Sequence, residues 1–330
     1  MTWDALLPRN AARLLRDSGG RIGSVAPSAV EVTFSFFAPR NPAVNLVGDF
    51  TTWVPEPMQS DERGWWRAER RLTDGVYQYR FQVQLVNRPV DEWVHVTDLR
   101  SPCVPTDKTA NRICIASGQI RRDDYVWRHD DAPLPLNEDL ASVCLTPDSP
   151  WFQGAAPSCE AVLDALDDIL ATGARAIVVP PADTLPGLGH DMGQPFFPSS
   201  ECREAGSFKR MVDECHRRGV RVIVEMECGQ GDVNGTLARI DHDYWYTTAA
   251  RMDGHAGTPR FDYERHDERL GVFPAQEFMR ACVFHWIDTY HIDGIRFVGA
   301  KSPADRAFLA QLGAEACARA TLKPFLIEVK

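Results

Sequence analysis

The sequence has little of what marks a nucleic-acid-binding, membrane-bound or secreted protein. Lysine is rare, with five among 36 basic residues, and 46 acidic residues give a net charge of −10. No block of basic residues interrupts this balance, so we expect neither a nucleic acid nor an anionic membrane as partner. No stretch approaches the ~20 apolar residues of a membrane helix. The amphipathic start, MTWDALLPRNAARLLRD, also has no signal-peptide apolar run.

Cysteine is present without the spacing that would give it a role. The nine cysteines are odd in number and scattered, and no C-x-x-C pair occurs among them. This argues against a disulfide framework or a zinc site and favours buried free thiols in a reducing compartment. We therefore expect a cytoplasmic protein with no metal and no other cofactor.

The first third of the chain is typical of β-structure. Short alternating runs such as VEVTFSFFA, AVNLVGDF, WWRAERRL and VYQYRFQVQ are separated by Pro, Asn, Asp and Gly. This spacing predicts a small immunoglobulin-like β-sandwich. We place it at 30–122, after a helical or irregular segment at 1–29, and a Pro- and Asp-rich linker follows at 123–139.

From residue 140 to 330 strands and helices alternate. Such alternation predicts parallel strands in a (β/α) TIM-type barrel. About five of the eight strands are present, so the predicted barrel is incomplete. Its first and last strands would be open edges, unless a second copy of the chain pairs with them. The predicted strands cover 140–146, 174–181, 220–227, 293–299 and 323–330, and the predicted helices cover 159–173, 206–219, 275–290 and 303–320.

Polar side chains gather where three of these predicted strands end. Glu225 and Glu227 close the third strand, Arg296 lies in the fourth and Glu328 in the fifth. Barrel enzymes carry their chemistry at these strand ends. Retaining glycoside hydrolysis needs two carboxyl groups ~5–5.5 Å apart, and adjacent strands are spaced about 4.8 Å apart. Glu328 fills one of the two places, but Val298 stands at the other.

Several segments occur in an order that is informative as a set. They are VNLVGDFTTWVPEPM and GWWRAERRLTDGVYQYRFQV (within 44–83), FKRMVDECHRRGVRVIVE, IDHDYWYTTA (240–249), FDYERHDERLGVFPAQEFMRACVFHWIDTYHIDGIRF (261–297) and KPFLIEV (323–329). In this order they resemble the α-amylase superfamily of retaining α-glucan hydrolases and branching enzymes. The resemblance covers about residues 30–330 and includes an N-terminal isoamylase-type, glycogen-binding module. It implies an α-1,4-glucan such as starch or glycogen as ligand.

The chain departs from that family at its site residues. The family pattern D-x-x-x-N-H is here EMECGQ, which puts Glu225, Gly229 and Gln230 at the three named positions. His190, in GHDMGQP, takes the place of the sugar-stacking tyrosine. In D-G-x-R-x-D the final aspartate is the nucleophile, and Val298 replaces it.

Two family positions are kept. The resemblance gives Arg296 the role of orienting the nucleophile and Glu328 that of general acid/base, while the third carboxylate belongs to a seventh strand that this sequence does not contain. Valine cannot form a glycosyl ester, so we expect a catalytically degenerate, C-terminally truncated member. Arg296 is then expected to lack its carboxylate partner. Either relaxed selection or a new role accounts for these departures.

The module keeps a coherent binding pattern. Aromatic faces stack on sugar rings, and Trp53 in GDFTTW matches a tryptophan typical of the family. Trp66 (or its neighbour Trp65) and Trp93 are further candidates, although core packing accounts for many tryptophans. Three functions stay open: a silent glucan-binding protein, an active α-glucan hydrolase or transferase using Glu328, and an interaction protein that oligomerises through open strand edges.

Overall fold

A computed structural model describes residues 29–86, 92–101, 109–121, 125–152, 158–180, 190–191, 194–198, 206–247, 258–320 and 324–330. The helix expected within 1–17 lies outside them. The chain divides into two compact units, one formed by 1–124 together with 239–242 and the other by 125–238 and 243–330. The division falls at the start of the segment expected to be a linker.

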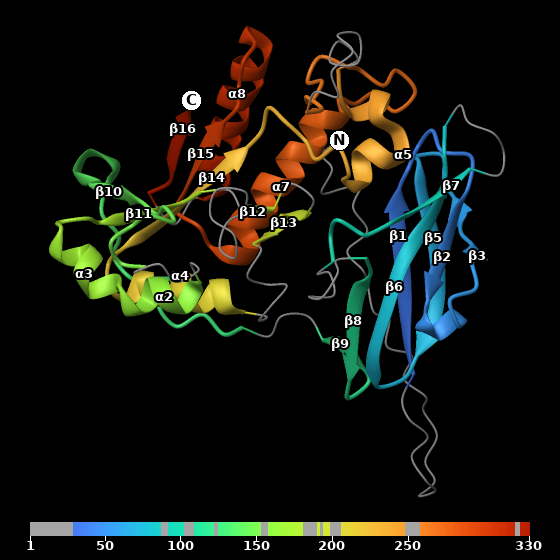
Figure 1. The fold of residues 1–330 in the computed structure, drawn as a ribbon, viewed down its shortest axis with the longest axis horizontal. Coiled ribbons are helices and arrows are strands. Elements are labelled where there is room, and N and C mark those ends of the chain that lie inside the picture. The colour runs from blue at the N-terminus through green and yellow to red at the C-terminus, as the bar shows by residue number, and fades with distance from the viewer. Residues whose placement is uncertain are drawn as a thin grey trace, which may run out of the picture. The chain divides into compact units, whose positions relative to one another are not determined.

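The first unit is built from two antiparallel sheets, as the alternating runs predict (Figure 1). The smaller sheet has the order β1-β5-β4, and the larger has β3-β2-β6-β8-β9, with β7 also paired to β6. The last two strands, β8 and β9, were not predicted individually. The nine strands described in this unit are β1 Val30–Phe37, β2 Val44–Gly48, β3 Glu56–Pro57, β4 Gln59–Ser60, β5 Trp65–Leu72, β6 Gly75–Gln84, β7 Trp93–Val96, β8 Asn111–Ala116 and β9 Gln119–Arg121, and a 3-10 turn covers Asp49–Thr51.

Side-chain alternation sorts the residues of β1 and β6 between a core and an outer face. Successive residues of a strand point to opposite sides, and every second residue of β1 is buried. Phe36 packs on Phe81 with ring centroids 4.6 Å apart, and Phe34 packs edge-on against Tyr79 at 4.8 Å. The intervening residues of β6, including Arg80, therefore lie on the outer face of the larger sheet.

The second unit contains one parallel sheet whose five strands follow chain order, β10-β11-β14-β15-β16. All five strands and the four helical regions occur where the sequence predicts them. The strands are β10 Ser142–Cys144, β11 Ala176–Val179, β14 Arg221–Glu227, β15 Gly294–Val298 and β16 Leu326–Val329, and the helices are α2 Cys159–Asp164, α3 Leu166–Ala171, α4 Ser207–Arg217, α7 Pro274–Tyr290 and α8 Pro303–Arg319.

Several details of this unit differ from the prediction. The helix expected at 159–173 is divided into α2 and α3 at Ala165, which itself keeps right-handed helical angles. A short hairpin, β12 His190–Asp191 with β13 Gln194–Pro198, and helix α5 Thr236–Trp245 were not predicted. The hairpin segment carries little apolar periodicity. In α5 the apolar residues recur at helical spacing, but the backbone leaves helical angles at Asp241 (φ −164°, ψ 78°), so the helix is kinked.

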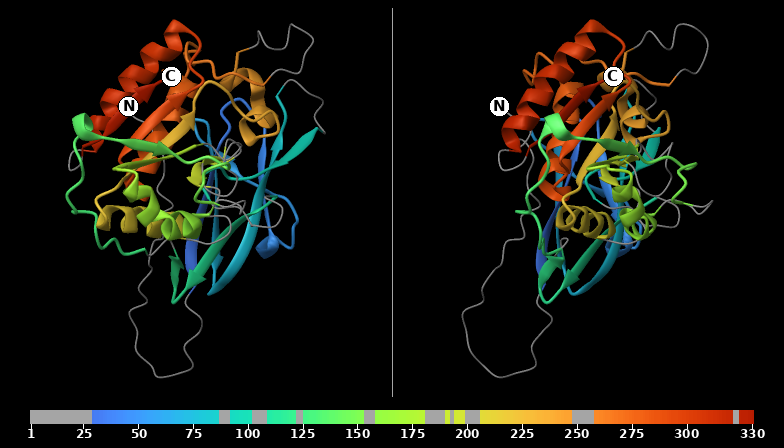
Figure 2. Two further views of the ribbon diagram at one scale, coloured as in Figure 1. Left: turned by 60° about the vertical axis from the view of Figure 1, so that its left-hand side comes forward. Right: turned by 90° about the vertical axis from the view of Figure 1, so that its left-hand side faces the viewer.

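Helix α8 shows how local sequence sets the ends of these elements. Ser302 precedes Pro303, and its hydroxyl accepts a hydrogen bond from the Asp305 backbone N–H at 3.0 Å. The Asp305 carboxylate accepts in return from the Ser302 backbone N–H at 3.1 Å. This reciprocal capping begins the helix at Pro303. Proline has no backbone N–H, and none is needed in the first turn of a helix. Figure 2 shows α8 beside the last two strands, and α8 contacts β16.

Within the described ranges, no helix is both long and apolar enough to cross a bilayer. The seven cysteines in these ranges are free thiols. Four of them, Cys159, Cys215, Cys228 and Cys282, are buried.

The segment that begins at residue 125 is held against α4 by hydrogen bonds to Asp213. The Asp213 carboxylate accepts hydrogen bonds from the Tyr125 hydroxyl at 3.0 Å and from the backbone N–H groups of Arg128 and His129 at 3.1 and 2.8 Å. Burial alone would raise the pKa of Asp213, but the His129, Arg128 and Tyr125 donors outweigh burial and lower it. Asp213 thus anchors the start of the second unit.

Because the pKa of Asp213 is lower in the folded chain, its contribution to stability is complete above the unfolded pKa of about 3.9 and is lost as pH falls through the folded value. We expect Asp213→Asn to lower the free energy of unfolding at pH 7 by about 1.5–3 kcal/mol. Urea unfolding at pH 7 and pH 3 would show the difference from wild type shrinking at the lower pH.

The matched control is Asp148→Asn, an exposed carboxylate with no described partner. It should change stability at pH 7 by no more than about 0.5 kcal/mol. Equal effects of the two substitutions at pH 7 would refute the anchoring role of Asp213.

Candidate functional site

The strand register places three charged side chains in one row across the parallel sheet. Glu225 of β14 is in register with Arg296 of β15, and Arg296 is in register with Glu328 of β16. Residues in register on neighbouring parallel strands point to the same face of the sheet. The fold therefore brings together Glu225, Arg296 and Glu328, which lie more than one hundred residues apart at the extremes.

The guanidinium of Arg296 bridges the two carboxylates. Its Nη1 lies 3.1 Å from Glu225 Oε1, and its Nε donates to Glu328 Oε2. Arg296 is 9% exposed, so its charged side chain is largely shielded from water by the surrounding protein. Burial alone would lower the pKa of Arg296, but the hydrogen bonds with Glu328 and Glu225 raise it above its usual range. The row is a charge-paired Glu–Arg–Glu cluster.

This cluster corrects one expectation from the sequence. Arg296 was expected to lack a carboxylate partner after the loss of aspartate at position 298, yet it has two. Glu225, on the neighbouring strand, is one of these partners. Glu328 is likewise engaged, since its Oε2 accepts from Arg296.

Val298 belongs to the next row and is half-buried opposite Glu227. Glu227 Oε1 accepts from the backbone N–H groups of Gly229 and Gln230 at 2.7 and 3.0 Å, so this carboxylate holds the turn after β14. The Val298 carbonyl accepts from the Cys228 backbone N–H at 3.0 Å. The chain thus binds the ends of β14 and β15 to each other beside the nucleophile position.

Two glycines allow this close approach. A Cβ atom on Gly229 would lie 1.9 Å from the carbonyl oxygen of Gly299. Gly299 has φ +87°, and a Cβ there would lie 2.0 Å from Glu227 Oε1. Gly229 replaces the asparagine of the family pattern, and the Gly299 carbonyl now occupies the space that an asparagine side chain would need.

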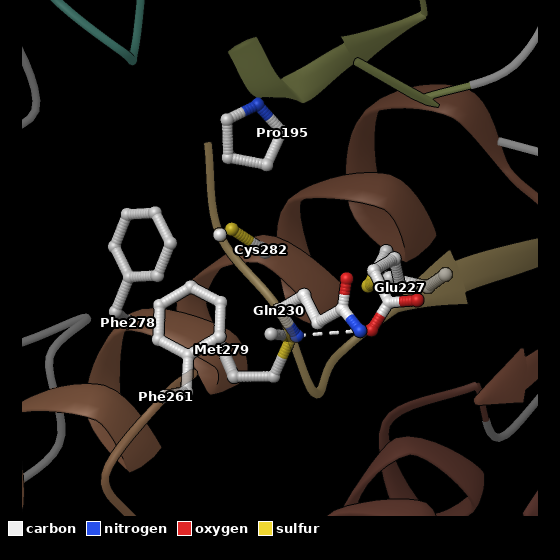
Figure 3. A pocket seen from close by; sticks show the side chains of 9 residues that line it. Pro195, Glu227, Gln230, Phe261, Phe278, Met279 and Cys282 are labelled. Carbon is white, nitrogen blue, oxygen red and sulfur yellow. Dashed lines mark hydrogen bonds between the residues drawn. The ribbon is translucent and has the colours of Figure 1, made fainter. Parts of the chain in front are cut away.

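Gln230 lines a small hollow next to these strand ends (Figure 3). The hollow holds about 300 Å³ of space not filled by atoms, including open solvent at its mouth. Glu227 and Gln230 are its polar side chains, and its other walls are mostly apolar, formed by Pro195, Met226, Phe261, Phe278, Met279 and Cys282 together with Gly231. The dashed line in Figure 3 marks the hydrogen bond from the Gln230 backbone N–H to Glu227 Oε1.

His190 starts the short strand β12. Its side chain lies outside the described residues, so its predicted contact with sugar stays a prediction. In the described part of the chain, no group of three or more His, Cys, Asp and Glu side chains is placed to hold a metal ion.

The three candidate tryptophans of the first unit differ in their surroundings. Trp53 is 41% exposed, and the guanidinium carbon of Arg80 lies 5.3 Å from the centre of its ring. Trp93 is half-buried on β7, in register with Gln84. Trp66 packs against the sandwich core and donates its indole N–H to the Ala38 carbonyl at 2.9 Å. These contacts favour a packing role for Trp66 and leave the Trp53 ring accessible, while Trp93 is half-buried beside Gln84.

Sequence reasoning did not single out Arg80, although the signal was present. The alternation of VYQYRFQVQ puts Tyr79, Phe81 and Val83 on one face, so Arg80 and Gln82 must share the other face. The stacking of Arg80 on Trp53 required the structure, because the two are far apart in the chain.

We expect Arg296→Met to lower the free energy of unfolding at pH 7 by about 2 kcal/mol. Removing one partner of a buried ion pair leaves uncompensated charge, and the exposure of Glu328, about one third of its side chain, reduces the loss. Urea unfolding of the variant checks this value. Adding Glu225→Gln and Glu328→Gln should restore part of the stability, because no unpaired charge then remains.

The control is Arg217→Met, which removes an exposed arginine paired with Glu214. Exposed pairs contribute little to stability because water and salt screen them. An Arg296→Met loss no larger than that of Arg217→Met, or a triple variant less stable than Arg296→Met alone, would contradict the paired-cluster interpretation.

Comparison with known proteins shows similarity in both units. Residues 22–98 match carbohydrate-binding module 48, the isoamylase N-terminal domain. The 1,4-α-glucan branching enzyme GlgB of Pseudoalteromonas atlantica is 24% identical over 309 residues, covering 83% of this chain and 38% of that enzyme. GlgB of Burkholderia thailandensis is 27% identical over 300 residues, covering 85% and 34%. The chain thus spans little more than one third of the length of these relatives.

Solved structures agree on the fold. The chain superposes on a putative α-amylase from Salmonella typhimurium with a TM-score of 0.67 at 16% identity, covering 96% of this chain and 50% of that one. It also superposes on the catalytic module of the pneumococcal glycogen-degrading protein SpuA with a TM-score of 0.64. The matched module and the branching-enzyme relatives support the α-amylase superfamily with an N-terminal carbohydrate-binding module of family 48, and the solved structures share the fold.

Proposed function

We propose that this protein binds α-1,4-glucan through its N-terminal module and does not cleave it. The observation that carries the proposal is the row formed by Glu225, Arg296 and Glu328, next to a valine at the nucleophile position. The match to carbohydrate-binding module 48 and the similarity to branching enzymes support α-glucan as the ligand.

The row lacks what covalent catalysis needs. A retaining mechanism requires a carboxylate that attacks the sugar and a carboxyl group that first donates a proton. Val298 cannot attack, and Oε2 of Glu328 is occupied by the hydrogen bond that it accepts from Arg296. Glu227 is no substitute, because its Oε1 is held by two backbone N–H groups.

The ends of β14 and β15 also leave little room for a sugar. Gly229 and Gly299 bring the two strand ends into contact where the family pattern has an asparagine side chain. The hollow beside them is lined mainly by apolar side chains. These features support binding elsewhere, on the aromatic surface of the module.

The module offers the chemistry that sugar binding uses. Trp53 is exposed, and Arg80 stacks on its ring, which holds the indole in place. A fixed aromatic face costs little entropy when it packs on a pyranose ring. Trp93, on β7, provides a second ring, and β7 pairs with β6, the strand that carries Arg80.

The test combines affinity electrophoresis in amylopectin gels with a reducing-sugar assay. We expect retardation of the wild type, and binding about five- to tenfold weaker for Trp53→Ala, since an aromatic contact contributes about 1 kcal/mol. The matched control is Val54→Ala, which removes the neighbouring exposed apolar side chain. It should behave as the wild type.

The assay should detect no sugar release by the wild type or by Glu328→Gln. Hydrolysis, or a change in iodine-stained glucan, that disappears in Glu328→Gln would replace this proposal with that of an active α-glucan enzyme. Absence of retardation for the wild type would refute glucan binding.

A further inference from the structure

Three uncharged polar side chains form a row across the outer face of the larger sheet of the first unit. Asn45 of β2 is in register with Gln82 of β6, and Gln82 is in register with His95 of β7. The three strands lie side by side in the order β2-β6-β7 (Figure 1). We name Asn45, Gln82 and His95 the amide–imidazole row.

The row has an internal order that leaves hydrogen-bonding groups available. Asn45 Nδ2 donates to Gln82 Oε1 at 2.9 Å, which fixes the orientation of both amides. Asn45 Oδ1 and Gln82 Nε2 have no hydrogen-bond partner among the described residues. One acceptor and one donor are therefore presented side by side, and His95 is exposed next to them.

The aromatic rings flank this row along the strands. Arg80, which holds Trp53, lies two residues before Gln82, and Gln84, in register with Trp93, lies two residues after it. Two residues of a strand span about 7 Å. The row therefore lies midway between the strand positions beside the two rings, about 7 Å from each.

His95 is suited to the same kind of ligand. His95 is exposed as a residue, but the protein around it removes part of its water; this partial burial, followed by the charges of Arg80 on β6 and Arg239 on α5, lowers the pKa of His95. A neutral imidazole has one N–H donor and one acceptor nitrogen. Sugar hydroxyls both donate and accept, whereas carboxylates only accept and guanidinium groups only donate. A row of amides and a neutral imidazole matches a neutral polyhydroxyl chain better than a charged ligand.

We propose that Asn45, Gln82 and His95 bind the hydroxyl edge of an α-glucan whose rings stack on Trp53 and Trp93. This inference rests on the proposed glucan-binding function and adds the residues that orient the chain between the two rings. Aromatic stacking alone tolerates many orientations, and directional hydrogen bonds reduce them to a few.

The test is calorimetric titration of the full chain with maltoheptaose at pH 7.5. We expect His95→Ala and Gln82→Ala each to weaken binding about three- to tenfold, the effect of losing one or two hydrogen bonds. His95→Gln, which keeps a donor and an acceptor, should recover part of the affinity. The matched control is Gln78→Ala on the same face of β6, outside the row and opposite Arg112. It should stay within about twofold of wild type.

The outcomes separate this inference from the function on which it rests. If the wild type does not bind maltoheptaose, both fall. If the wild type binds and Trp53→Ala weakens binding, but His95→Ala and Gln82→Ala behave like Gln78→Ala, only the role of the row is overturned. A reduced number of binding sites at unchanged affinity in the two row variants would indicate unfolded protein and would also count against the row. Weaker binding at unchanged stoichiometry, with partial recovery in His95→Gln, supports it.

Discussion

A guanidinium group buried among parallel strands must be neutralised by its neighbours, and Arg296 meets a carboxylate on each side. Both carboxylates come from adjacent strands at the same register position, so the cluster ties β14, β15 and β16 together at one point. A charge in this place is destabilising unless it is paired. Once aspartate is absent from position 298, Glu225 and Glu328 become the groups that make Arg296 compatible with the fold. The same two contacts hold one oxygen of each carboxylate on the guanidinium.

The sequence predicted the elements of the fold better than their boundaries. Alternation of period two located the strands of the sandwich, and strand–helix alternation located the five parallel strands and the four helical regions. The hairpin β12–β13 escaped prediction because its segment has no strong periodicity, and α5 is a short helix kinked at Asp241. The strands β8 and β9 contain several polar residues, so their sequences resemble the turns around them.

The site was predicted residue by residue, but its connections were not. Val298 and Glu328 were recognised from their places in family motifs. The partnership between Glu225 and Arg296 depends on the register of two strands separated by about seventy residues, which no local pattern encodes. In the first unit, the motif identified Trp53, whereas Arg80, Gln82 and His95 become meaningful only when three strands are seen side by side. Sequence patterns predict which face of a strand a side chain lies on, whereas the pairing of strands in the sheet decides which side chains become neighbours.

The contact between Gly229 and Gly299 bears on how this chain can change in evolution. With no side chain at either position, the two strand ends pack directly against each other, and the Gly299 carbonyl oxygen lies where a Cβ at position 229 would be. Any larger residue at position 229, an asparagine included, would require the strand ends to separate. Single substitutions that introduce a side chain there would therefore lower stability, so the backbone itself limits which residues this position accepts.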